Sequence, residues 1–170
     1  MPEPFGCLDA AYAETAASAA CVLFPAWDAA APLRVVTTRQ GAAPAYEPGA
    51  FYKRELPILL AVLEQLERPP GTVIVDGYVW LDAGARPGLG AMLHRALAER
   101  IPVVGVAKTA FAGADAGIAV VRGGSARPLY VSAVGIDAEE AAKGVQSMHG
   151  QHRIPTLLQI ADRAARHALA

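Results

Sequence analysis

The hydrophobic pattern divides the chain into a run of strands followed by alternating helices and strands. Apolar and β-branched runs at residues 5–12, 19–24 and 33–39 are joined by short connections and predict three strands of an antiparallel meander. The segments 73–77, 102–107 and 129–134 are short apolar runs typical of buried strands, and residues 118–121 are a candidate short strand. The order predicts an α/β protein with a mixed central sheet.

Helical spacing of apolar residues appears between these strands and after them. One such pattern covers residues 51–66 and is made largely of leucines, and similar patterns cover residues 87–100 and 137–148. Asp137 is a candidate N-cap for the third helix, and Pro155 begins the last one. The helices are expected to flank the sheet, and a length of 170 residues suits a single domain spanning residues 1–170.

Composition narrows the class of protein. Although 54% of the residues are hydrophobic, no stretch reaches the roughly 18 apolar residues of a membrane span, so no membrane association is expected. The N-terminus lacks the pattern of a signal peptide, and two cysteines do not make a disulfide framework, which together favour the cytoplasm. The net charge of −1 argues against a broadly basic surface, but it is compatible with a small basic groove.

Acidic residues stand at three places where a ligand could bind. Asp76 follows three β-branched residues at a predicted strand end, Asp9 lies on the first strand, and Glu55 lies near a helix start. If the first strand and the Asp76 strand pair, two carboxylates become neighbours, and a divalent cation would relieve their repulsion. Taken singly, each acid could serve only as a turn former, a strand-end residue or a helix-dipole charge. Lys108, at the mouth of another buried strand, could bind phosphate or simply face solvent.

These residues fall within a set of segments that resembles the endonuclease V family, a group of metal-dependent nucleases acting on deoxyinosine or inosine. The similar segments follow one another along nearly the whole chain: residues 8–12, 46–55, 73–77, 101–108, 129–132 and 153–156. The resemblance implies an RNase H-like fold. It also implies hydrolysis of a phosphodiester bond, usually the second one on the 3′ side of the altered base, in DNA or RNA.

The resemblance further implies roles for the acids and the lysine. Asp9, Glu55 and Asp76 would hold Mg²⁺, or Mn²⁺ in its place, together with the attacking water. Lys108 would steady the scissile phosphate. The partner implied is nucleic acid, with DNA and RNA both open, and a monomer is expected.

A second group of residues would handle the altered base. By the same resemblance, Tyr46 and Pro48 would form a wedge that separates the strand, although an aromatic residue in such a loop can also be a surface lid. Gly49, Phe51 and Gly77 would line the pocket for the extruded base. Extrusion costs a few kcal/mol and costs least where pairing is already poor, which suits a deaminated base.

The chain also departs from the family at two positions where a histidine is usual. Asp82 stands where a His-Pro-Arg-Arg-like stretch begins, and Asp137 is the nearest polar residue to a missing Gly-His. Both aspartates are tentative members of the site, and Asp137 could instead serve only as a helix cap. The departures leave open an alternative function, a divergent nucleic-acid-binding protein of the same fold with weak catalysis or none.

Overall fold

The computed structural model describes residues 2–83, 85–110 and 117–170, and within these ranges the chain forms seven strands and four helices. In chain order the elements are β1 (Phe5–Tyr12), β2 (Ala16–Phe24), β3 (Arg34–Gly41), α1 (Tyr52–Leu63), β4 (Thr72–Asp76), α2 (Leu89–Ala96), β5 (Val103–Ala107), β6 (Ile118–Val120), β7 (Leu129–Val134), α3 (Ala138–Ser147) and α4 (Thr156–Leu169). No helix among the described residues is long and apolar enough to cross a membrane.

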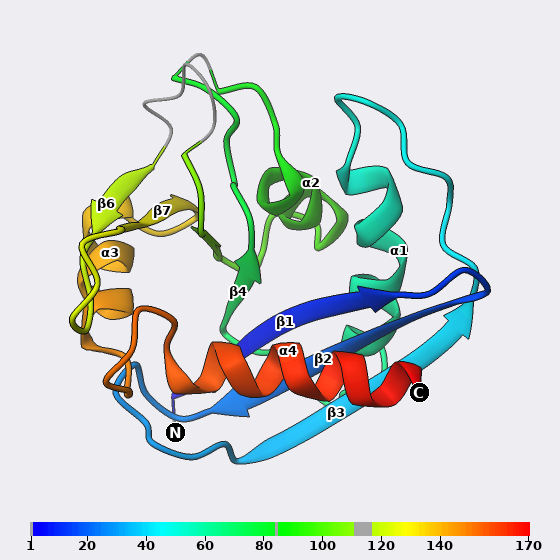
Figure 1. Ribbon diagram of the computed structural model, residues 1–170, viewed down its shortest axis with the longest axis horizontal. Coiled ribbons are helices and arrows are strands. Elements are labelled where there is room, and N and C mark those ends of the chain that lie inside the picture. Colours follow the sequence, from blue (N-terminus) through cyan, green and yellow to red (C-terminus); the bar gives the residue numbers. More distant parts are fainter. Residues whose placement is uncertain (1, 84, 111–116) are drawn as a thin grey trace.

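The described strands form one mixed sheet in the order β3-β2-β1-β4-β5-β7-β6 (Figure 1). β1, β2 and β3 are the predicted antiparallel meander, and β4 and β5 join the other edge of β1 as parallel strands. β7 then pairs antiparallel with both β5 and β6. The prediction of a mixed sheet, with β1 inside it and the Asp76 strand beside it, is confirmed.

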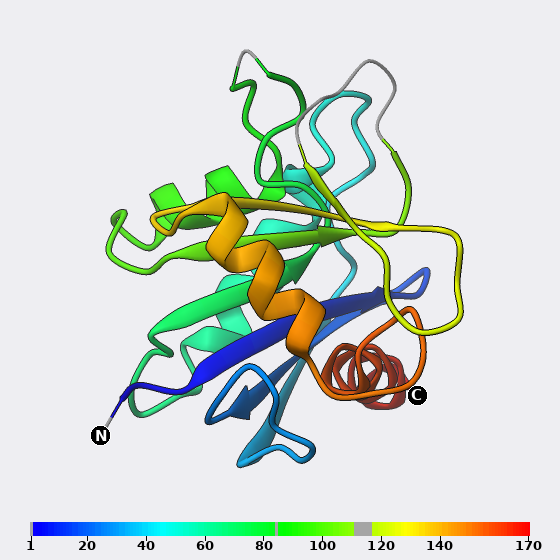
Figure 2. The same cartoon turned by 90° about the vertical axis from the view of Figure 1, so that its left-hand side faces the viewer.

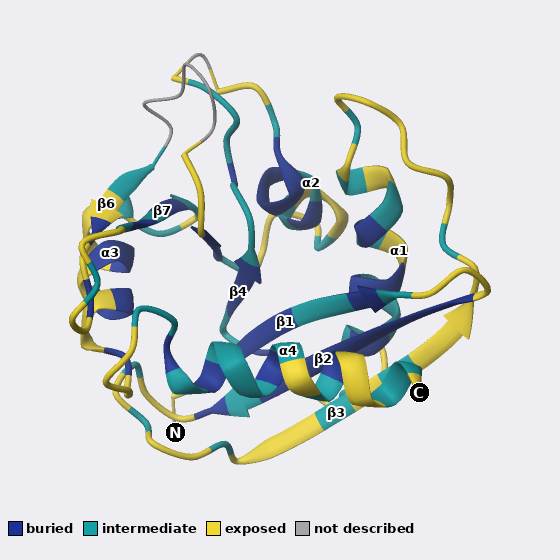
Figure 3. Cartoon of the chain, in the orientation of Figure 1, coloured by how far each residue is buried: buried dark blue, intermediate teal, exposed yellow. Residues whose placement is uncertain are grey.

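Helices cover both faces of the sheet and enclose two apolar cores. α3 and α4 pack on one face, and α1 and α2 pack on the other (Figures 1 and 2). Alternation along the strands sends Cys7 and Ile74 into the first core, and Leu8, Val73 and Val75 into the second. β2 is almost wholly buried, whereas the edge strand β3 is largely exposed (Figure 3).

The second helix is shorter than the hydrophobic pattern predicts. A helix was expected over residues 87–100, but α2 covers only Leu89–Ala96. Pro87 instead forms an isolated bridge with Trp80, which holds the preceding loop together. At the other end, Ala98 and Glu99 both adopt a left-handed backbone conformation with φ of 57° and stop the helix. Such a conformation is unusual for residues that are not glycine, so the sequence gives no sign of it.

Strand pairing sets the position of the site. Leu8 pairs with Val75 in the parallel ladder, so the next residues, Asp9 and Asp76, stand at the same level on neighbouring strands. β4 ends at Asp76, and the connections of residues 42–51 and 77–88 rise from this end of the sheet (Figures 1 and 2). In open α/β sheets this is the end at which ligands bind.

Candidate functional site

Three acidic side chains border one small cavity at the carboxyl end of β4. Asp9 comes from β1, Asp76 ends β4, and Glu55 lies in the first turn of α1. Within the described ranges, however, no three histidine, cysteine, aspartate or glutamate side chains already stand as a set that could ligate a metal ion. The structure thus brings the three predicted acids to one cavity, but their carboxylates do not surround a common position for an ion.

Burial and mutual repulsion change the protonation of two of these acids. Burial, followed by the charges of Asp9 and Asp76, raises the pKa of Glu55 to about 8, while Arg54 opposes this rise. Burial, followed by the charge of Asp76, raises the pKa of Asp9 to about 7. Glu55 Oε2 is buried and has no hydrogen-bond partner among the residues described. Unpaired buried carboxylates are costly, so this part of the cavity favours a cation.

A cation–π contact with Tyr12 holds Arg54, the residue that precedes Glu55. The guanidinium carbon of Arg54 lies 4.4 Å from the centroid of the Tyr12 ring. Arg54 precedes Glu55 on α1, and its charge stabilises the ionised form of Glu55. Tyr12 therefore holds the arginine whose charge acts on Glu55, a role that the sequence did not indicate.

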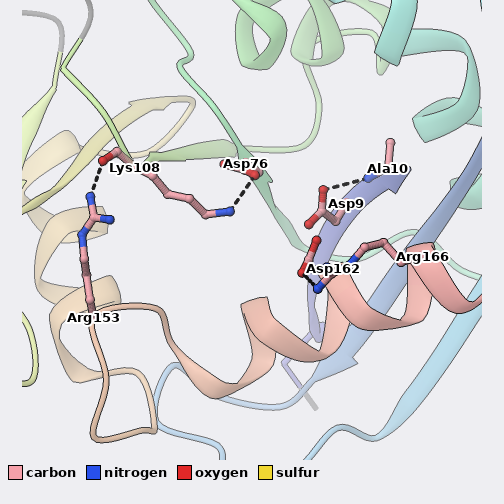
Figure 4. Close-up of polar contacts among 7 residues, drawn as sticks. All are labelled: Asp9, Ala10, Asp76, Lys108, Arg153, Asp162 and Arg166. Atoms are coloured by element: carbon pink, nitrogen blue, oxygen red, sulfur yellow. Dashed lines mark hydrogen bonds and ion pairs between the residues drawn. The ribbon is translucent and has the colours of Figure 1, made fainter. Parts of the chain in front are cut away.

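Lys108 reaches into the site from the end of β5. Its Nζ lies 3.1 Å from Asp76 Oδ2, in a half-exposed ion pair (Figure 4). Burial lowers the pKa of Lys108, but the charge and hydrogen bond of Asp76, with smaller effects of Asp9 and Asp162, more than offset it, so the pKa is raised. The lysine stays charged and lies beside Asp76.

A fourth acid at the site was missed by the sequence analysis. Asp162 of α4 lines a cavity of about 160 Å³ together with Asp9, Asp76 and Lys108. It contributes to the raised pKa of Asp9, after burial and the charge of Asp76, and it pairs with Arg166 one turn along the helix (Figure 4). One signal was present: Asp162 lies four residues after Leu158 and so shares its face of the helix.

A larger cavity of about 370 Å³ opens beside the acids, and Asp76 belongs to its wall. Gly49, Phe51 and Gly77, which the resemblance placed in a base pocket, line this cavity, and so does Tyr46. The rings of Tyr46 and Phe51 are tilted by 60° to one another with centroids 6.3 Å apart, and 58% and 49% of these residues are exposed. Pro48 is not among the lining residues, so only Tyr46 of the expected wedge pair borders the cavity.

The opposite wall of this cavity contains residues that the sequence did not single out. They come from the connection after β4 and from the start of α2: Tyr78, Leu81, Arg86, Gly88 and Leu89. The hydroxyl of Tyr78 donates to the carbonyl of Thr109 at 2.7 Å, which ties this connection to the end of β5. A largely aromatic and apolar cavity of this kind suits a flat ligand such as a nucleobase.

The two tentative aspartates have structural partners. Asp137 accepts a hydrogen bond from the Glu140 N–H at 3.0 Å and is the N-cap of α3. Since Val134 pairs with Val103, Asp137 lies near the amino end of β5, whereas Lys108 follows its carboxyl end. The structure therefore does not bring Asp137 to the site.

Asp82 closes the turn in the connection after β4. It accepts from the Arg86 N–H at 3.1 Å, and its Oδ2 lies 3.6 Å from Arg86 Nε. Arg86 lines the larger cavity, whereas Asp82 lines none of the cavities around the acids. Asp82 therefore contacts a residue of the cavity wall but does not border the cavity itself.

Comparison with known proteins relates this architecture to one family. The family model for endonuclease V matches residues 3–118. The endonuclease V of Rhodospirillum centenum is 35% identical over 155 residues, covering 78% of this chain and 63% of the relative. That of Streptomyces avermitilis is 32% identical over 146 residues, covering 73% and 62%. The chain therefore spans a little over three-fifths of the length of these relatives.

Solved structures agree with the family model. The crystal structure of endonuclease V from Streptomyces avermitilis has a TM-score of 0.82 and 29% identity, covering 99% of this chain and 83% of that one. The endonuclease V of Ciona intestinalis, in complex with a 24mer DNA containing an inosine followed by a ribo-adenosine, has a TM-score of 0.81 at 20% identity, covering 97% and 85%. The second likeness shows the fold alone, which is RNase H-like. Together with the family model, these relatives show that the chain belongs to the endonuclease V family.

Proposed function

We propose that the protein is a metal-dependent endonuclease that hydrolyses a phosphodiester bond near inosine or deoxyinosine in nucleic acid. The observation that carries this proposal is the adjacency of two hollows that share Asp76. One is bordered by three acids, and the other is an aromatic cavity open to solvent. A base held in the aromatic cavity would keep the neighbouring backbone beside the acids. Membership of the family and the inosine-containing complex of the Ciona relative support the choice of substrate.

The residues present fit a divalent cation. Glu55 Oε2 is buried and lacks a partner in the described ranges, and the raised pKa values of Glu55 and Asp9, caused first by burial and then by neighbouring carboxylates, mark an uncompensated negative site. Carboxylate oxygens are the donors that Mg²⁺ and Mn²⁺ accept. We assign Asp9, Glu55 and Asp76 as the residues that would hold the ion. Asp162 is a fourth acid nearby, in the neighbouring cavity that it shares with Asp9 and Asp76. When bound, Mg²⁺ would supply charge stabilisation at the phosphate and a lowered pKa for water.

The chain's own residues would divide the remaining work. Asp76 pairs with Lys108 through Oδ2 alone. If a cation takes over the Asp76 carboxylate, the Lys108 ammonium is released to bind an oxygen of the scissile phosphate. Because the pKa of Lys108 is raised, the ammonium stays charged at neutral pH. Glu55 Oε2 is the carboxylate oxygen still open to accept a hydrogen bond from the attacking water.

The aromatic cavity would hold the extruded base. Tyr46 and Phe51 stand at its mouth with exposed rings on which a base can stack. Unstacking a base costs a few kcal/mol, and the cost is lowest for a poorly paired base such as hypoxanthine. Discrimination thus arises both from pairing strength and from the cavity.

Cleavage of labelled oligonucleotides tests the proposal. Single- and double-stranded DNA and RNA, each with inosine or with the matching unmodified base, are incubated with Mg²⁺, Mn²⁺ or EDTA. We expect cuts near inosine that require the cation and disappear in EDTA. The second candidate function, binding without catalysis, rests on the absence of a closed three-ligand set in the described ranges. It predicts inosine-dependent binding with no cut under any of these conditions.

A further inference from the structure

A fourth hollow, here called the basic groove, lies on the far side of Lys108 and belongs to none of the three cavities described above. It has a volume of about 230 Å³ and is lined by Lys108, Arg127 and Arg153 together with four uncharged residues. Among the described residues, no carboxylate contributes to its wall. Three cationic residues line this hollow in a chain whose net charge is −1, and they favour the binding of an anion there.

One wall of this basic groove is fixed by the side chain of Arg153. Its Nε donates to the Arg127 carbonyl at 3.1 Å, and its Nη2 donates to the carbonyls of Pro128, at 2.9 Å, and Lys108 (Figure 4). A single guanidinium thereby ties the end of β5 to the connection before β7. The groove is therefore built across segments that are distant in sequence.

Arg127 supplies the charge that is available. Its side chain is exposed, and within the described ranges its guanidinium has no hydrogen-bond or ion-pair partner. Its backbone N–H donates to Ser125 Oγ at 3.1 Å, so the residue is held in a turn at the wall of the groove. An arginine in this state can give a paired set of hydrogen bonds to phosphate without first breaking a contact.

Three of these hollows follow one another in a fixed order: the aromatic cavity, the cavity of about 160 Å³ and the basic groove. The aromatic cavity shares Asp76 with the acid-lined cavity of about 160 Å³, and the latter shares Lys108 with the basic groove. Consider a nucleic-acid strand with its base in the aromatic cavity and its scissile phosphate at the cavity of about 160 Å³. The next part of this strand reaches the basic groove. The groove is positioned as the continuation of the nucleic-acid path.

We propose that the basic groove binds the backbone phosphate that follows the scissile phosphate on its 3′ side, with Arg127 as the principal contact. This inference rests on the proposed function, and the direction of the strand follows from the cut on the 3′ side of the altered base that the family resemblance implies. It predicts that binding and cleavage depend on one particular phosphate beyond the cut. It also predicts that this dependence is carried by a residue outside the acid cluster.

The test removes the phosphate charge and the arginine charge separately and together. Inosine-containing single strands carry one methylphosphonate, either at the first linkage 3′ of the scissile one or at a linkage several nucleotides 5′ of inosine. Wild type, Arg127→Gln and Arg127→Lys are compared, with Arg34→Gln as the matched control. Arg34 is an exposed arginine at the opposite end of the sheet. Affinity is measured by fluorescence anisotropy in EDTA over a range of salt, and single-turnover cleavage is measured with Mg²⁺.

We expect the 3′ methylphosphonate to weaken wild-type binding about three- to tenfold and the 5′ one to have less effect. Arg127→Gln should weaken binding of the unmodified strand by a similar factor, lower the salt slope by about 0.7 and show no further loss with the 3′ methylphosphonate. Arg127→Lys should keep most of the affinity, and Arg34→Gln should behave as wild type.

Two kinds of failure are distinguishable in this design. If wild type cleaves at inosine but the 3′ methylphosphonate weakens Arg127→Gln as much as wild type, the groove is not the phosphate site and the proposed function stands. If wild type cleaves no inosine strand, the proposed function fails. The binding arm then decides the groove: equal effects of the 3′ and 5′ substitutions would overturn the inference.

Discussion

Asp76 and Lys108 end neighbouring parallel strands, and their side chains pair across the site at 3.1 Å. Both residues are assigned to the reaction, one to the cation and the other to the scissile phosphate. In the structure, each neutralises the other. Because the pair is half-exposed, breaking it costs little, about 1 kcal/mol or less. Binding of a cation and of a phosphate would then be coupled, since each ligand releases the partner that the other needs.

Glu55→Gln should reduce the loss of stability of the metal-free protein at alkaline pH. Burial, then the charges of Asp9 and Asp76, raises the pKa of Glu55 from 4.5 to about 8, so the folded state holds a proton that the unfolded chain releases. Stability from this proton is fully present below about pH 4.5 and is lost as the pH rises toward 8. Denaturant midpoints in EDTA at pH 5.5 and 8.5 should fall less in the variant than in wild type.

The same measurement with Mg²⁺ adds a control. The cation should restore stability mainly at pH 8.5, where the carboxyls are ionised. A wild-type midpoint that does not change between the two pH values would contradict the buried, protonated state of Glu55.

Arg54→Met should move the acidic limb of the pH–rate profile to higher pH. Arg54 opposes the rise in the pKa of Glu55, which burial and the charges of Asp9 and Asp76 cause, so removal of its charge leaves the glutamate protonated over a wider range. Methionine keeps an apolar chain over the Tyr12 ring, and Arg54→Lys retains the charge as the matched control. Single-turnover cleavage with saturating Mg²⁺ from pH 5.5 to 9 measures the shift. An identical acidic limb in wild type and Arg54→Met would count against the electrostatic role.

Tyr46→Ala should weaken binding of inosine-containing strands more than binding of unmodified strands. The exposed ring lines the aromatic cavity, and stacking on one base contributes about 1–3 kcal/mol, or roughly 5- to 150-fold in affinity. Phosphate contacts, which the variant retains, supply the affinity shared by both strands. Anisotropy titrations in EDTA measure the difference, with Tyr46→Phe expected to bind as wild type does. Equal losses for both strands would refute a role in recognising the base.

Asp137→Ala should lower stability without changing cleavage. The carboxylate caps α3 through the Glu140 N–H, and loss of such a cap costs about 0.5–2 kcal/mol. Asp137→Ser, which can still cap, should recover most of the loss. Thermal unfolding and cleavage rates measured on the same samples separate the two effects. A cleavage defect in a folded Asp137→Ala protein would return this residue to the site.

The sequence predicted the parts of the fold that depend on short-range patterns. Apolar runs and helical spacing located the meander and the alternating elements, and the expected pairing of the first strand with the Asp76 strand placed Asp9 beside Asp76. The bounds of α2 were wrong because left-handed Ala98 and Glu99 end it early, and their identities give no indication of that conformation.

The missed site residues are brought in by tertiary packing. Asp162 reaches the acids because α4 crosses β1 and β2, and the basic groove forms because Arg153 bonds to three carbonyls from two other segments. No local sequence pattern predicts these tertiary contacts. Conversely, the position of Asp137 in the sequence suggested that it belongs to the site. Because β7 runs antiparallel to β5, Asp137 instead lies at the opposite end of the strands from Lys108.

The most direct test of the central claim is single-turnover cleavage of an inosine-containing strand by Asp76→Asn in saturating Mg²⁺. Asparagine keeps the size of the side chain but removes the negative charge shared by the cation-binding and base-binding hollows. The account predicts loss of cleavage by at least about 100-fold, with an unfolding midpoint close to that of wild type and inosine binding retained. Metal-dependent cleavage at a rate near that of wild type would contradict the assignment of these acids as the catalytic site.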